Sequence, residues 1–321
     1  MKFKAPNPTP PGLFRRTPPA VFPAIMGAFG LGLAWRRAAE RFAVPEAIGE
    51  AVLGAISLLF LFSFVAYAAK FLRRPGVIVE DLRILPGRAG LAALMLCLYL
   101  QALALAPHGR AAAEAVLFAG LGLHVAFVAV LVWQMVRGPA EQRRVTPVWH
   151  LSFVGFIVGA LAASALGHAG LAFVLFAATA TIAALVWAIS ADQLLNAEVP
   201  APLRPLLAIH LSPAALLGLV AAAFGLSTLA TIFAALAAVL LGALLLRGRW
   251  LTAAGFSPLW GAFTFPLAAT ASLWLTLGGP WRLPGGLALV LATLVIPPIL
   301  FRVLKMWAGG QLAVKTNAAA A

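Results

Sequence analysis

GLAFVLFAATATIAALVWAIS, the stretch from Gly170 to Ser190, contains no charged residue and is long enough to cross a lipid bilayer. A helix of about 20 apolar residues spans the hydrocarbon core, which is about 30 Å thick. Gly90–Leu105 and Gly285–Val303 are similar runs. With 63% hydrophobic and 10% charged residues, the 321-residue chain has too little polar surface for a soluble globule. Because the runs are too long and uniformly apolar for barrel strands, the sequence predicts an all-α integral membrane protein.

Ten such stretches divide the chain, and the loops between them leave no room for a separate soluble domain. We therefore expect a cytoplasmic N-terminal tail over residues 1–18, a ten-helix transmembrane domain over 19–309 and a cytoplasmic C-terminal tail over 310–321. The predicted spans are 20–37, 47–72, 87–106, 111–137, 147–166, 170–191, 203–222, 225–247, 256–277 and 284–307.

The positive charge of the chain is divided unequally between the two sides of these spans. The formal net charge is +14, and of the 23 Lys and Arg residues, 18 fall on the side of the termini and 5 on the other. Lys and Arg accumulate in cytoplasmic loops, so both termini are predicted to be cytoplasmic, which requires an even number of crossings. The basic residues are therefore explained by their attraction to anionic lipid headgroups and by the orientation of the chain in the membrane, and they do not indicate a nucleic-acid partner.

Every second predicted span carries a proline inside it or at its beginning. Pro23, Pro86, Pro147, Pro213 and Pro266 follow one another at intervals of 53 to 66 residues. The intervening spans are long and rich in Ala, Leu and Val. Because proline bends a helix and removes a backbone donor, we interpret the pattern as five helical hairpins, each with a kinked inner helix and a straight outer helix. Five inner helices in a ring would enclose a central pore. The competing interpretation is that prolines are simply common in membrane helices.

Three segments carry a family resemblance, and a fourth supports it. They read FPAIMGAFGLGLAWRR (Phe22–Arg37), TPVWHLSFVGFIVGALAAS (Thr146–Ser164), SPLWGAFTFPLAATASLW (Ser257–Trp274) and, more weakly, LRPLLAIHLSPAALLG (Leu203–Gly218). With ten predicted helices, the chain resembles the tellurite-resistance/C4-dicarboxylate transporter family, whose members include TehA-like proteins and the slow-type anion channels. Trp260–Pro266, which has the pattern W-x-x-F-T-F-P, is the most specific part.

This resemblance implies a structure and a location. It implies five hairpins around a central pore, a homotrimer with one pore per subunit, and a place in the bacterial inner membrane. It also implies a phenylalanine gate in the ninth span, which falls on Phe265. Phe263 is the alternative; since it lies about 200° away around a helix, only one of the two rings can face the axis.

The predicted spans hold no acidic residue at mid-bilayer depth, which favours passive movement of anions over ion-coupled transport. We expect a passive anion channel or uniporter for small monovalent anions such as chloride and nitrate. The alternative is a carrier or exporter of C4-dicarboxylates, tellurite, sulfite or another small organic anion. The Gly-x-x-x-x-Gly-Lys-Ser/Thr nucleotide loop is absent, and no clustered catalytic set indicates an enzyme. The candidates for lining the pore are Pro23, Ser152, Pro213, Thr264, Pro266 and Ser272.

The histidines offer a second, weaker functional hypothesis. His150 and His210 lie in predicted inner spans, where they could sense pH; the alternative is a neutral histidine bound to a backbone carbonyl at a kink. No pair has the His-x-x-x-His spacing, and Cys97 is the only cysteine. The sequence therefore predicts neither a metal site nor a cofactor.

Overall fold

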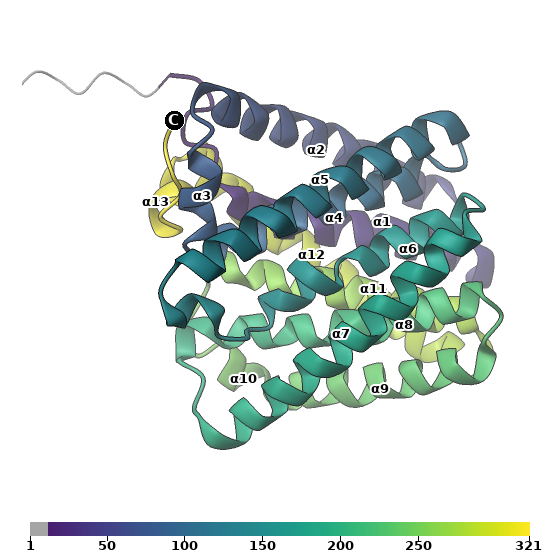
Figure 1. The fold of residues 1–321 in the computed structure, drawn as a ribbon. Coiled ribbons are helices and arrows are strands. Elements are labelled where there is room, and N and C mark those ends of the chain that lie inside the picture. The colour runs from purple at the N-terminus through teal and green to yellow at the C-terminus, as the bar shows by residue number, and fades with distance from the viewer. Residues whose placement is uncertain (1–11) are drawn as a thin grey trace, which may run out of the picture.

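The computed structural model describes residues 12–321, and this part of the chain is helical without any strand (Figure 1). The prediction of an all-α fold is confirmed. The long helices are α1 (Phe22–Phe42), α2 (Ala47–Arg73), α4 (Leu85–Leu105), α5 (Arg110–Arg137), α6 (Phe156–Ala165), α7 (Ala169–Asn196), α8 (Leu211–Ala223), α9 (Ser227–Leu246), α11 (Thr264–Leu277) and α12 (Arg282–Ala308). The short ones are α3 (Val77–Leu82), α10 (Gly248–Leu251) and α13 (Gln311–Lys315).

Six further segments have tighter or wider turns than an α-helix. Five are 3₁₀ segments: η1 (Pro19–Val21), η2 (Ala140–Arg143), η4 (Ala201–His210), η5 (Pro258–Phe263) and η6 (Gly279–Trp281). The sixth, η3 (His150–Val154), is a π-helix directly before α6. Within residues 12–321, seven helical stretches are long and apolar enough to cross a membrane: α2, α4, α5, α7, η4 with α8, α9, and η6 with α12.

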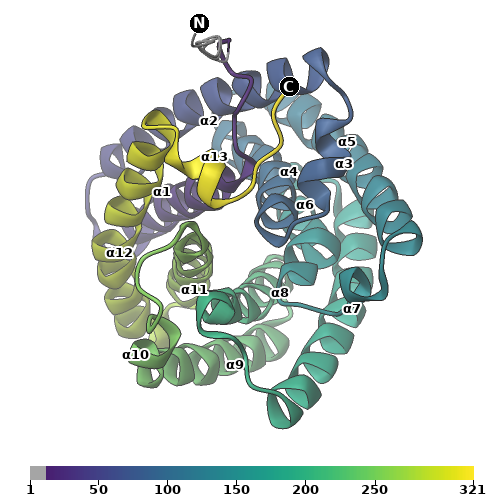
Figure 2. The same ribbon diagram turned by 90° about the vertical axis from the view of Figure 1, so that its left-hand side faces the viewer.

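The helices form an inner and an outer layer (Figure 2). The inner helices α1, α4, α6, α8 and α11 contact one another in a closed cycle, in which α11 also contacts α1. Each is followed by an outer helix that packs against it, namely α2, α5, α7, α9 and α12. In the most apolar stretch of 18 consecutive residues of each helix, 78% of the residues are buried in the inner helix α4 but only 17% in the outer helix α9. The outer helices therefore expose the apolar surface that a bilayer would cover.

Four of the five prolines that mark the predicted inner spans lie near the beginning of an α-helix, and the fifth, Pro147, lies in a turn before η3. Pro23 is the second residue of α1 and Pro86 is the second residue of α4, where the helix does not need the missing backbone N–H. Pro213 and Pro266 are the third residues of α8 and α11, each directly after a 3₁₀ segment. The outer helix α12 also holds Pro297 and Pro298 in its interior, so proline inside a helix does not by itself distinguish inner from outer helices in the described chain.

Three arginines at the end opposite the termini bind the carbonyl ends of inner helices. Arg36 donates to the carbonyls of Leu103 and Ala104 on α4. Arg41 donates to Leu275 and Thr276 of α11, and Arg110 to Leu166 after α6. The last carbonyls of a helix have no intrahelical partner and carry partial negative charge. These arginines therefore stabilise the ring of inner helices.

The C-terminal segment folds back onto the helical domain. Helix α13 packs against α12 and η1, and Leu312 is buried. The amide N–H of Ala319 donates to Asp81 Oδ1 (2.8 Å). The other carboxylate oxygen of Asp81, Oδ2, forms an ion pair with Lys70 Nζ at 2.8 Å. Arg15 accepts from the N–H of Ala321 (3.0 Å), so both described ends of the chain lie together. Residues 1–11 of the predicted N-terminal tail are outside the described part of the structure.

Candidate functional site

A small central cavity lies where all five inner segments begin. Its lining comes from α1, α4, η3, α8 and α11 together with the 3₁₀ segments before them. Its volume of about 20 Å³ for water centres is room for about one water molecule. None of the lining side chains is charged; they include Pro23, Met26, Ala89, Leu151, Ser212 and Pro266. The cavity is thus a neutral chamber inside the ring of inner helices.

Ser212 provides a polar group in this chamber. Its side chain is buried, and Oγ has no hydrogen-bond partner in the described chain. A buried hydroxyl without a partner is unusual because its lost hydration is not compensated. The hydroxyl can therefore donate to a water molecule or an anion in the cavity.

Phe265 lies one helical turn deeper than the cavity, against α1. Its ring is 2% exposed, and a Cβ added at Gly30 would come within 3.0 Å of ring atom Cδ2. Successive residues of a helix are rotated by 100°, so around the axis of α1 the direction of Gly30 falls between those of Pro23 and Met26, which both line the cavity. It lies four residues beyond Met26, or about 6 Å deeper. The Phe265 ring therefore packs against Gly30 where α1 contacts α11, and the missing side chain of Gly30 makes room for it.

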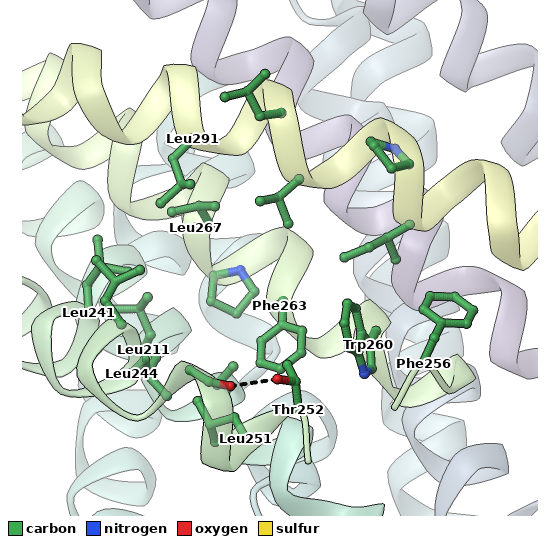
Figure 3. Close-up of a pocket in the computed structure, with 18 of the residues that line it drawn as sticks. Leu211, Leu241, Leu244, Leu251, Thr252, Phe256, Trp260, Phe263, Leu267 and Leu291 are labelled. Atoms are coloured by element: carbon green, nitrogen blue, oxygen red, sulfur yellow. Dashed lines mark hydrogen bonds between the residues drawn. The ribbon is translucent and has the colours of Figure 1, made fainter. Parts of the chain in front are cut away.

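Phe263 faces a different space, the outer pocket between α9, α11 and α12 (Figure 3). This pocket has a volume of about 410 Å³ and lies outside the ring of inner helices. In Figure 3 the Phe263 ring is directed into it, close to Trp260, whose ring centroid is 5.7 Å away. The two phenylalanines of the F-T-F-P pattern thus contact different sides of the inner ring.

The other predicted lining residues are divided between the cavity and the helix contacts. Pro23 and Pro266 line the cavity, whereas Ser152, Pro213, Thr264 and Ser272 are buried and do not. The single hydroxyl proton of Thr264 is shared between the Gly261 carbonyl (Oγ1 at 2.7 Å) and the more distant Pro23 carbonyl (3.2 Å), so this hydroxyl lies at the contact between α1 and α11. Sequence reasoning missed Met26 and Ser212. The signal for Ser212 was its position directly before Pro213 in an inner segment.

His150 and His210 form a pair, but on the outer side of the inner ring. His150 Nε2 lies 2.9 Å from His210 Nδ1, so one ring donates a proton to the other. His210 lines a groove between α7 and α9, while its neighbour Ile209 lines the central cavity. His150 Nδ1 and His210 Nε2 have no partner in the part of the chain that the structure describes. His210 therefore contacts the groove, and neither histidine of the pair lines the central chamber.

Charged groups occur at the two ends of the molecule, and because the chain has 23 Lys and Arg but 9 Asp and Glu residues, only a minority of the basic groups can have an acidic partner. Lys70 and Asp81 are fully buried at the end of the termini. Arg74, directly after α2, is bonded to Glu80 on α3, and this hydrogen bond lowers the pKa of the Glu80 carboxyl below its ordinary value. No group of three His, Cys, Asp or Glu side chains in residues 12–321 could hold a metal ion.

Comparison with known families matches nearly the whole chain. A family model described as voltage-dependent anion channel covers residues 16–306. This family is that of the TehA-like/C4-dicarboxylate transporters, so the resemblance noted in the sequence is confirmed. A search of curated proteins found no match.

Proposed function

The chain belongs to the voltage-dependent anion channel family, and we propose that it is a passive channel for small monovalent anions whose gate is the Phe265 ring. It is a multi-pass integral membrane protein of a channel and transporter family. The observation that carries the proposal is the position of the buried Phe265 ring, against Gly30 and one turn below a neutral cavity. A ring in that place blocks an axial path by its size and by excluding water.

The proposed architecture has ten crossings, arranged as five hairpins around the central path. The contact of each inner helix with the following outer helix, and the closed cycle of inner helices, support it. Both termini would be cytoplasmic in a bacterial inner membrane, in line with the excess of Lys and Arg on their side. The homotrimer rests on the family resemblance alone; sedimentation of the protein in detergent would test it.

Passage through this path would depend on weak binding. The cavity has no acidic group to repel an anion and no basic group to retain one. The Ser212 hydroxyl is one donor that could replace part of a hydration shell. We therefore expect permeability to follow the cost of dehydration, so that weakly hydrated nitrate passes more easily than chloride. Reversal potentials that favour chloride over nitrate would contradict this order.

A carrier or exporter of C4-dicarboxylates, tellurite or sulfite is the alternative function. The two mechanisms differ in kinetics, because a carrier saturates with substrate and supports counterflow, whereas a channel does neither over the same range. Liposomes that contain the purified protein separate them: anion flux is measured with chloride, nitrate and a C4-dicarboxylate for the wild type and Phe265→Ala. The channel proposal predicts nonsaturating flux that rises in Phe265→Ala. Saturable exchange unchanged by Phe265→Ala would overturn it.

That the His150–His210 pair makes transport sensitive to pH stays a prediction. The central chamber is lined by uncharged side chains, and the histidine of the pair that reaches a pocket, His210, lines the α7–α9 groove instead. Any effect of pH would therefore reach the conduction path through a movement of η3 or η4 rather than through a charge in the path. Comparing the pH dependence of flux in the wild type and His150→Gln tests this hypothesis.

A further inference from the structure

We propose that the groove between α7 and α9 is a binding site for an anionic glycerophospholipid of the leaflet next to the chain termini. The groove has a volume of about 980 Å³, at the upper end of the range for ligand sites. Its back wall is η4 and the beginning of α8, and its sides are the last turns of α7 and α9. This site is separate from the central cavity and from the proposed gate.

Two buried polar groups in the groove lack a partner. His210 is 9% exposed and Ser190 is 5% exposed, and both line the groove. Among residues 12–321 neither His210 Nε2 nor Ser190 Oγ has a hydrogen-bond partner, whereas His210 Nδ1 is bonded to His150. Polar groups this deeply buried are normally satisfied. A ligand with a hydrogen-bonding group at their depth would satisfy them.

The remaining lining has the chemistry of a lipid site. Leucines from α7, α8 and α9 form the apolar walls, including Leu194, Leu211, Leu236, Leu240 and Leu244. The stretch of α9 from Leu236 to Arg247 is about 16 Å long, close to the roughly 15 Å thickness of one apolar leaflet. An acyl chain therefore fits along it with its head at Arg247.

Charge at the mouth of the groove favours an anionic head. Arg247 lines the mouth and is exposed, and no ion pair engages its guanidinium within the described residues. Glu198, the acidic residue of the lining, is already paired with Arg204 at 2.8 Å. The lipid phosphate would therefore bind Arg247. Ser190 lies six residues before the end of α7, about 9 Å deeper, where a glycerol ester carbonyl would accept from Ser190 or His210.

Native mass spectrometry of the full chain in detergent tests this proposal, with phosphatidylglycerol and phosphatidylcholine of the same acyl chains added separately. We expect tighter binding of phosphatidylglycerol. Arg247→Gln should weaken its binding about fivefold, which corresponds to about 1 kcal/mol for one basic residue at a membrane surface. Arg249→Gln is the matched control, because Arg249 is also exposed but does not line the groove; its effect should be less than about twofold.

Leu240→Trp fills the apolar part of the groove and should weaken the binding of both lipids. Equal effects of Arg247→Gln and Arg249→Gln would overturn the proposal, since they would indicate nonspecific attraction of charge. Unchanged lipid binding in Leu240→Trp would also overturn it. So would cross-linking of Leu240→Cys between two copies in place of lipid binding, because a second copy would then cover the groove.

Discussion

Replacing Phe265 by alanine should open the central path, and its burial sets the size of the effect. If the gate opens by moving the ring out of its buried position, opening loses about 1.5 to 3 kcal/mol of burial energy for a phenylalanine side chain. The ring is 2% exposed, so nearly all of this energy applies. Removing the ring removes that part of the barrier, and anion flux should rise roughly 10- to 150-fold. The assay is chloride or nitrate flux in proteoliposomes at equal protein density.

Two controls separate gating from damage to the fold. Phe263→Ala removes the ring next to Phe265 in the pattern, but that ring lines the outer pocket, so flux should change less than about twofold. Phe29→Ala removes a fully buried ring that packs against Phe60 at 5.7 Å, so it should lower thermal stability without raising flux. A well-folded Phe265→Ala protein with wild-type flux, or an equal rise of flux in Phe29→Ala, would refute the reasoning.

Three further substitutions test the contacts that hold the ring of helices together. Lys70→Met leaves Asp81 buried without its cation and should cost about 3–5 kcal/mol, seen as a lower melting temperature that Lys70→Met/Asp81→Leu partly restores; no difference between single and double variants would contradict this. Arg41→Gln removes the donors to Leu275 and Thr276 and should cost about 1–3 kcal/mol, whereas Arg37→Gln, which loses only an exposed pair with Glu40, should cost less than about 1 kcal/mol. His124→Leu removes the histidine bound to the Ser152 carbonyl and leaves the Tyr99 hydroxyl with the Gly120 carbonyl at 3.5 Å, so it should cost about 1–3 kcal/mol, measured by thermal unfolding; a His124→Leu variant as stable as the wild type would contradict the role of these contacts.

Positions of the helices could be predicted from the sequence because each depends on one continuous apolar run. The predicted span 203–222 corresponds to η4 with α8, which covers Ala201–Ala223, and 284–307 corresponds to α12. The side of each inner helix that faces the centre could not be predicted, because these helices are apolar all round and carry no stripe that marks one face. For this reason Ser212, which lines the central cavity, was missed, while Pro213 and Ser272 stay predictions as pore-lining residues.

Contacts between distant segments also escaped sequence reasoning. The His150–His210 pair joins residues 60 positions apart, and Arg41 binds a carbonyl 234 residues away. The π-helix at His150–Val154 had no local signal beyond Pro147, and the Ser152 carbonyl within it is bound by His124 Nε2 at 3.0 Å. Such pairings depend on how helices pack, which a single sequence does not specify. Conversely, Phe265 was selected by its place in the F-T-F-P pattern.

The most direct test of the gate moves the aromatic ring from α11 to α1. It asks whether a ring in the space that Phe265 fills beside Gly30 closes the anion path. Gly30 lies on the neighbouring helix α1, where an added Cβ would come within 3.0 Å of the Phe265 ring and of the Ala268 Cβ. We predict that Phe265→Ala conducts, and that adding Gly30→Phe to it returns anion flux to near the wild-type level while the protein remains folded. Flux in the folded double variant equal to that of Phe265→Ala would contradict the proposal that this ring closes the path.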